Sequence, residues 1–79
     1  MKGSVFGING DRCAVKIDSG ITLFRIQGTH STEVGDIISG NLDALGSEPL
    51  FNETKKERLR VFIARWGCSK AGADKYLNP

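Results

Sequence analysis

Apolar and polar residues alternate through the first third of the chain. Cys13, Val15 and Ile17 fall on one side of an extended backbone, while Ala14 and Lys16 fall on the other. A period of two residues is typical of a β-strand with one face buried and one face in water. The sequence therefore predicts β-structure here, and the frequent glycines of the first half argue against helices.

Short turn signals divide this region into three segments. The dipeptide Asn9-Gly10 readily adopts the positive φ angles of a tight hairpin turn, and Ser19-Gly20 provides a second turn. The segment 21–26 is rich in β-branched and aromatic residues, which favour strands. We therefore expect a three-stranded meander with strands at 2–8, 12–18 and 21–27.

The second half of the chain continues the pattern with shorter segments. Val34, Ile38 and Leu42 can share one face of a strand that bends at Gly40. Alternation returns near the end, where Leu59 begins a run of apolar residues at every second position. The predicted elements are a fourth strand over 34–42, a turn over 46–49, a short strand over 50–52, a charged hairpin tip over 53–57 and a last strand over 58–65.

A short helix is predicted at the end of the chain. Ser69 is a favourable N-cap for residues 70–77, which include several apolar side chains. Gly72 and the short length make such a helix marginal alone, so it must dock on the strands to persist. We expect a β-barrel over 1–67 and a docked helical tail over 68–79, forming a single domain.

Length and strand count together define the fold class. With 79 residues the chain forms one domain that buries about 60% of its unfolded surface, so its core is thin. Closing the sheet disposes of exposed strand edges, which a small β-protein must manage. We predict a mainly β protein, a small five- to six-stranded antiparallel barrel with a short C-terminal helix.

Three segments resemble the OB-fold group, in particular cold-shock-type and ribosomal-type RNA-binding barrels. They are 3–8, 13–17 and 34–40, the last opening with Val34-Gly35-Asp36 at the entry to the fourth strand. The resemblance covers residues 2–65 and implies an OB-like barrel that binds RNA. The chain departs from the cold-shock pattern in strands two and three, where only Phe24 stands in for the aromatic contact residues.

Catalysis and metal binding find little support in the sequence. His30 is the only histidine and lies among polar residues of a connecting segment, and neither Cys13 nor Cys68 has a neighbouring ligand at metal spacing. The two cysteines suit free thiols in a reducing compartment. No apolar run approaches the length of a membrane span. We expect a cytoplasmic, non-enzymatic protein that needs no cofactor, metal or membrane.

Positive charge collects at one end of the sequence. The net charge is only +2, but residues 1–50 carry four Lys or Arg against six Asp or Glu, whereas residues 51–79 carry seven against three. By strict alternation, one face of the last strand carries Arg58, Arg60, Phe62, Ala64 and Trp66. Arginines meet phosphates and aromatic rings stack on unpaired bases, so this face is typical of single-stranded nucleic-acid binding.

Two interpretations compete for this face. In the first, the protein binds single-stranded RNA or DNA, with RNA favoured, and Lys16 and Phe24 add contacts from the outward faces of strands two and three. In the second, the helix covers Phe62 and Trp66, and the arginines form a solvated rim paired with Glu57 or Asp74. A protein partner docking on the same face is a further alternative. The candidate nucleic-acid contacts are Lys16, Phe24, Lys55, Lys56, Arg58, Arg60, Phe62 and Trp66.

Overall fold

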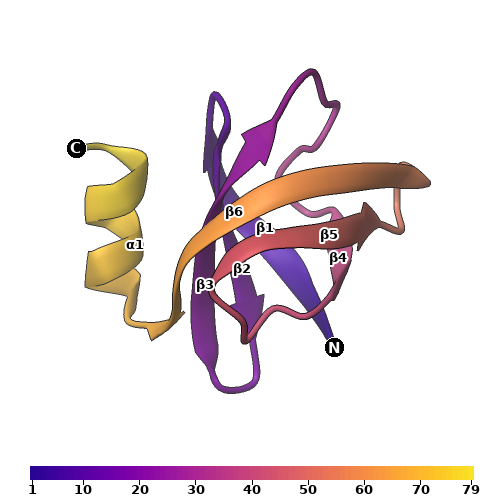
Figure 1. The fold of residues 1–79 in the computed structure, drawn as a ribbon. Coiled ribbons are helices and arrows are strands. Elements are labelled where there is room, and N and C mark those ends of the chain that lie inside the picture. The colour runs from indigo at the N-terminus through magenta and orange to yellow at the C-terminus, as the bar shows by residue number, and fades with distance from the viewer.

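Six antiparallel strands close into a barrel, and one helix follows them in a computed structural model that describes residues 1–79 (Figure 1). The closed barrel and its C-terminal helix confirm the predicted fold class. No helix is long and apolar enough to cross a bilayer. The elements are β1 (Lys2–Asn9), β2 (Arg12–Ile17), β3 (Gly20–Gln27), β4 (Ile37–Gly40), β5 (Gly46–Asn52), β6 (Glu57–Cys68) and α1 (Lys70–Leu77).

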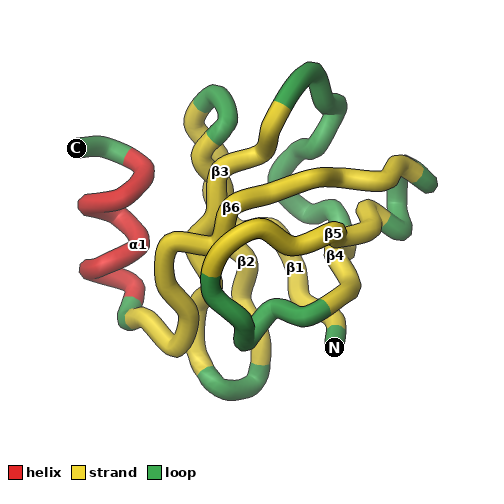
Figure 2. The backbone as a smooth tube through the Cα atoms, viewed as in Figure 1, coloured by secondary structure: helices red, strands yellow, loops and turns green.

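The strand order around the barrel is β1-β2-β3-β6-β5-β4, and β4 pairs with β1 to close it. The meander β1-β2-β3 and the hairpins β4-β5 and β5-β6 join neighbours in the sequence. β3 and β4 lie on opposite sides of the ring, so the connection over 28–36 crosses one end of the barrel (Figure 2). This crossing segment holds most of the polar contacts described below.

Most predicted elements match the structure, and the bounds of the last three strands differ. The last strand, β6, runs to Cys68 and not to residue 65 as predicted. The meander and the helix are confirmed, and the Ser69 side chain caps the helix by accepting a hydrogen bond from the Gly72 N–H. The fourth strand is shorter than predicted and begins at Ile37. The predicted turn over 46–49 is wrong, because these residues pair with β6 and extend β5. Pairing with a long neighbouring strand outweighs the turn preference of glycine and proline.

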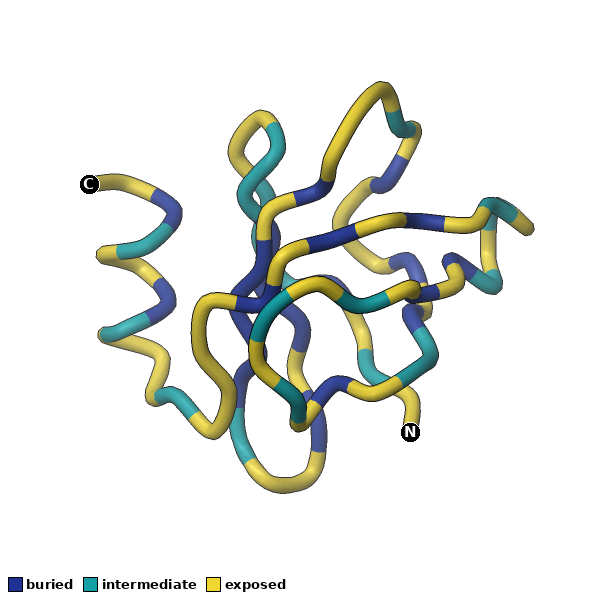
Figure 3. The backbone as a smooth tube through the Cα atoms, in the orientation of Figure 1, coloured by how far each residue is buried: buried dark blue, intermediate teal, exposed yellow.

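The apolar residues form two separate clusters. Twelve buried residues, among them Val15, Phe24 and Val61, fill the barrel interior. A second cluster lies between the outside of the barrel and α1, where Leu23 packs with Leu77 and other residues (Figure 3). Strands β2 and β3 are therefore buried on both faces. This arrangement explains why consecutive residues at 13–15 and 21–24 are all buried.

The last strand changes direction beyond Phe62. Ile63 pairs with Phe24, but Arg65 pairs with Leu23 and Cys68 with Ile21, so β6 carries extra residues at two points. Such β-bulges bend a strand and redirect its side chains. The bulged half of β6 leads away from β5, whose pairing with β6 begins at Gly46, and delivers the chain to α1.

Candidate functional site

The outward positions of three neighbouring strands form an exposed surface without a carboxylate. These positions alternate with buried ones along β3, β5 and the first half of β6. The side chains are basic, aromatic or small and polar, so the surface is positively charged. We call this surface the outer face; it consists of Arg25, Gln27, Ser47, Pro49, Phe51, Arg58, Arg60 and Phe62.

Cross-strand pairing brings aromatic rings beside arginines on the outer face. Phe62 lies between Arg25 of β3 and Ser47 of β5. Phe51 of β5 lies opposite Arg58 of β6. The two rings are 50% and 37% exposed, respectively, which is high for large apolar side chains. Directly opposite residues share a face with Cβ atoms about 5 Å apart, so each ring has a guanidinium within reach.

The arginines of β6 are available for an external partner. Arg58 and Arg60 take part in none of the ion pairs or side-chain hydrogen bonds of the structure. Their predicted pairing with Glu57 or Asp74 is wrong, because the Glu57 carboxylate accepts hydrogen bonds from Ser31 instead. Arg25 does pair with Asp11 at 3.2 Å, but this exposed contact contributes little stability.

Each exposed phenylalanine borders a shallow hollow. Asp11, Arg25, Gln27 and Gly28 line the hollow beside Phe62. A second hollow lies beside Phe51 and is lined by Ser39, Pro49 and Arg58, among others. A flat ring at the edge of an open hollow offers a stacking surface that a planar ligand can reach.

Trp66 is exposed but lies away from the arginine row. The two bulges of β6 interrupt strict alternation, and Trp66 borders a hollow with Leu45 and Gly72 near the start of α1. It remains 46% exposed, so the prediction that the helix covers Phe62 and Trp66 is wrong. The helix instead packs over Leu23 and its neighbours, because it approaches from the side of β1, β2 and β3.

Two other candidate residues lie elsewhere. Phe24 was expected on the outward face of the third strand, and this placement is wrong: its ring is fully buried inside the barrel. Lys16 is exposed, but it lies opposite Ser4 and Ile21 on the side of the barrel near the helix. The structure therefore does not bring Lys16 or Phe24 together with Arg58, Arg60 and Phe62.

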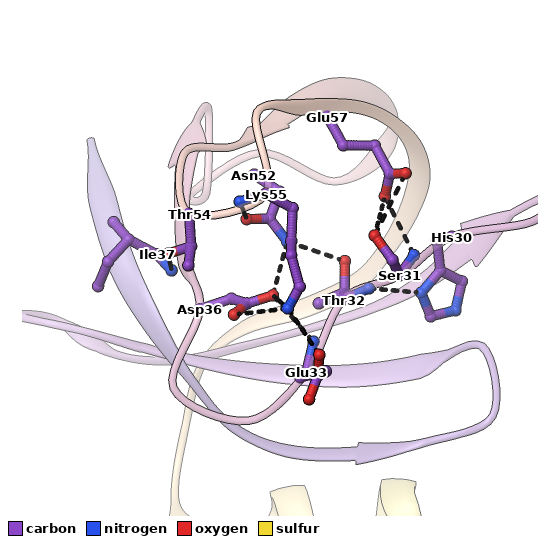
Figure 4. A network of polar contacts seen from close by, with 10 residues as sticks. All are labelled: His30, Ser31, Thr32, Glu33, Asp36, Ile37, Asn52, Thr54, Lys55 and Glu57. Atoms are coloured by element: carbon purple, nitrogen blue, oxygen red, sulfur yellow. Dashed lines mark hydrogen bonds and ion pairs between the residues drawn. The ribbon is translucent and has the colours of Figure 1, made fainter.

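The two lysines of the hairpin tip also differ from expectation. Lys55 is tied to the crossing segment, with its Nζ atom 2.7 Å from the Glu33 carboxylate and 3.3 Å from that of Asp36 (Figure 4). The hydrogen bond to Glu33 is the main cause that raises the pKa of Lys55. Lys56 is exposed at the β5–β6 turn in the left-handed backbone region, with φ of 54°. Neither lysine belongs to the outer face.

Asp36 is the centre of the polar network in Figure 4. Its buried carboxylate accepts hydrogen bonds from the Asn52 side chain at 2.9 Å and from the Glu33 N–H at 3.0 Å, besides its contact with Lys55. Burial alone raises the pKa of Asp36, but these hydrogen bonds and the Lys55 charge outweigh it and hold the pKa below its ordinary value.

His30 completes this network without a catalytic arrangement. The Thr32 N–H donates to Nδ1 of His30 at 3.2 Å, so the neutral ring carries its proton on Nε2, which lies 3.2 Å from the Gly10 carbonyl. No group of three His, Cys, Asp or Glu side chains is placed to hold a metal ion. The network fixes the crossing segment to the β1–β2 turn and to β5.

Sequence reasoning missed two residues of the outer face. Arg25 lies next to Phe24, and the error over Phe24 directed attention to the wrong side chain of β3. Phe51 belongs to the strand predicted over 50–52, but only the register with β6 places it opposite Arg58. Arg25 follows from the alternation of exposed and buried residues in the second half of β3, so the sequence pattern contains its signal. The position of Phe51 beside Arg58 depends on strand pairing, which the pattern does not give.

Comparisons with known proteins identify no relative of this chain. No protein-family model matches the chain. Comparisons with curated proteins and with solved structures likewise give no match.

Proposed function

We propose that the protein is a non-enzymatic module that binds single-stranded nucleic acid on its outer face. The observation that carries the proposal is one exposed sheet face whose own side chains include three arginines, two accessible phenylalanine rings and no carboxylate. The one carboxylate beside it, Asp11 of the β1–β2 turn, pairs with Arg25. The resemblance to RNA-binding OB-like barrels also supports it, and on that ground RNA is the favoured ligand. The OB fold has five strands, whereas this barrel has six.

The chemistry of the face suits a single strand better than a duplex. Guanidinium groups form charge-assisted hydrogen bonds to phosphate oxygens. The faces of Phe51 and Phe62 can stack only on bases that are not already stacked in a helix. Arg58, Arg60 and Phe62 follow one another at every second residue of β6, about 6.7 Å apart, so a strand laid along β6 meets them in turn.

Salt dependence of binding provides the main test. Three phosphate contacts through Arg25, Arg58 and Arg60 predict a slope of about −2 in log K against log salt for a single strand. Affinity for a dye-labelled oligonucleotide should then fall roughly 20-fold between 50 and 200 mM salt. Fluorescence anisotropy with matched RNA and DNA strands measures this. A folded protein that binds neither strand at 50 mM salt would contradict the proposal.

Single substitutions test which face binds. Arg60→Gln should weaken binding and reduce the salt slope by about 0.7, because one phosphate contact is lost. Phe62→Ala should cost about 1–3 kcal/mol of binding free energy through lost stacking, with the salt slope unchanged. Lys16→Gln is the matched control, since it removes one exposed charge on another side of the barrel. Equal losses in Arg60→Gln and Lys16→Gln would show that binding is not localised to the outer face.

A protein partner on the same face predicts a different outcome. Binding would then depend weakly on salt, and Phe62→Ala would abolish capture of the partner without any effect of nuclease treatment. The unpaired Arg58 and Arg60 favour nucleic acid, because an anionic polymer neutralises both of them, and its phosphates can compete with the exposed Asp11 for Arg25.

A further inference from the structure

A groove between α1 and the bulged half of β6 gathers positive charge from three elements. Arg12 of β2, Arg65 of β6 and Lys75 of α1 line it, together with the ring of Tyr76. No carboxylate lines this hollow, and Asp74 of the same helix is not part of it. We call this hollow the basic groove.

The cations of the basic groove are not neutralised by carboxylates, and contacts with Tyr76 hold Arg12 in place. The Arg12 guanidinium donates to the Tyr76 carbonyl at 2.9 Å and lies 5.2 Å from the centre of the Tyr76 ring. One of its five N–H donors is used in that bond, so most of them remain for a ligand. Arg65 and Lys75 are exposed, and neither takes part in the ion pairs of the structure.

The basic groove adjoins the outer face through one row of paired residues. Arg12 lies directly opposite Arg25, and Arg25 lies directly opposite Phe62. Neighbouring strands are about 4.8 Å apart, so Arg12, Arg25 and Phe62 form a continuous row from the basic groove to the Phe62 ring. Like charges directly opposite each other destabilise a sheet. Of this arginine pair only Arg25 has a carboxylate partner, Asp11, so an anion at the groove would relieve the repulsion.

We propose that the basic groove binds phosphates of the same single strand that occupies the outer face, so that α1 forms part of the binding surface. This inference rests on the proposed function. Along β6 the outer face extends from Arg58 to Phe62, about 13 Å. An unstacked strand advances roughly twice the 3.4 Å of a stacked one per nucleotide. The outer face therefore accommodates two to three nucleotides, and a longer strand continues past Phe62 into the groove.

The test compares two ligand lengths in two matched double variants. Arg65→Gln/Lys75→Gln removes two charges from the groove, and Lys16→Gln/Lys70→Gln removes two exposed charges that do not line it. Binding of a dinucleotide and a decanucleotide is measured at 50 and 200 mM salt. Circular dichroism and thermal unfolding confirm that each variant is folded.

The groove variant should bind the decanucleotide about tenfold or more weakly at 50 mM salt, with a salt slope smaller by about 1.4. Its affinity for the dinucleotide should match the wild type, and the control variant should lose little with either ligand. Equal losses in both variants, or equal losses with both lengths, would overturn the inference while leaving the outer face intact. Failure of the wild-type protein to bind either oligonucleotide would overturn both proposals. Binding of an acidic peptide alone would do the same.

Discussion

Asp36 shows how one buried carboxylate can hold a long loop in place. The sequence places it only in the Val34-Gly35-Asp36 segment at the entry to the predicted fourth strand, whereas the structure gives it donors from Glu33, Asn52 and Lys55. Hydrogen bonds to a charged group are each worth about 1.5–3 kcal/mol. The crossing segment over 28–36 therefore depends on a single negative charge buried at the end of the barrel.

This charge predicts the pH dependence of stability. Because the folded protein holds the pKa of Asp36 below its ordinary value of 3.8, the stabilisation is complete well above pH 3.8 and is lost as the pH falls through the lower folded value. Asp36→Asn should lower the free energy of unfolding at pH 7 by about 1.5–3 kcal/mol. The difference from the wild type should shrink below pH 4.

Denaturant unfolding at a series of pH values from 7 down to 2.5 measures this difference. Asp43→Asn is a suitable control, because Asp43 is exposed and takes part in none of the ion pairs or side-chain hydrogen bonds. A gap between Asp36→Asn and the wild type that stays constant down to pH 2.5 would contradict the assignment.

At the same scale, Phe24 shows the limit of pattern reading. Alternation divides a strand into two faces but does not say which face is covered. In β3 both faces are covered as far as Phe24, because Leu23 packs under α1 while Phe24 fills the barrel, but Arg25 and Gln27 are exposed. For this reason, the alternation pattern alone did not identify Arg25 as an exposed residue of β3. The outward direction of Arg58, Arg60 and Phe62 was predictable, since the first half of β6 is buried on one face only.

The sequence of α1 favours a helix only weakly, so the helix depends on its packing against the barrel. Gly72 lies within its eight residues, and glycine in a helix interior costs about 1 kcal/mol relative to alanine. A Cβ atom at this position would meet only ordinary contacts, the nearest being 3.7 Å from the Ser69 Oγ atom. Gly72→Ala should therefore raise the free energy of unfolding by about 0.5–1 kcal/mol.

Gly7→Ala supplies the contrasting change. A Cβ atom on Gly7 of β1 would lie 2.5 Å from the Cδ1 atom of Leu77, so the Leu77 side chain must move, which disturbs its packing between α1 and the barrel. Chemical denaturation of both variants should give shifts of opposite sign. If Gly7→Ala proved as stable as the wild type, α1 would not be held against β1 as described.

Strand boundaries were predictable where local signals decided them. The meander follows from glycine turns and alternation, and the helix follows from its cap. The strand over 46–52 was not predictable, because Gly46 and Pro49 are turn formers and only the register with β6 makes them part of a sheet. The bulges of β6 also arise from pairing with β3, and they displace Trp66 from the row where strict alternation placed it.

For the whole molecule, the two cysteines provide a measure of global opening. Cys13 is fully buried, and burial, with a smaller effect of the Asp36 charge, raises the pKa of its thiol to about 12. Cys68 is partly exposed. The thiolate is the reactive form of cysteine. A disulfide reagent at pH 8 should therefore label Cys68 quickly and Cys13 only as fast as the barrel opens.

The labelling rate is followed with the wild type and with Cys68→Ser. In the variant the fast phase should vanish and the slow phase should remain, accelerating with denaturant. Two thiols of equal reactivity in native buffer would contradict the buried position of Cys13.

Charge is also a property of the whole molecule that the sequence revealed only in part. The excess of Lys and Arg after residue 50 pointed to β6, and Arg58 and Arg60 bear this location out. Arg12 and Arg25 come from the half of the chain with a negative balance, and barrel pairing carries them to the same side. The sequence could not show this, since it depends on how the ring closes.

The closed ring of strands affects how quickly the protein folds. The meander and the β5–β6 hairpin can form from neighbouring residues, but the β3–β6 and β1–β4 contacts join positions as distant as Ile21 with Cys68 and Lys2 with Ser39. Loop entropy is lost before such contacts repay it, so barrels of this kind fold in milliseconds to seconds. We expect closure of the ring, which places the crossing segment over the end of the barrel, to limit the folding rate. Substitutions that stiffen this segment should then change the folding rate, measured by stopped-flow refolding, more than the unfolding rate.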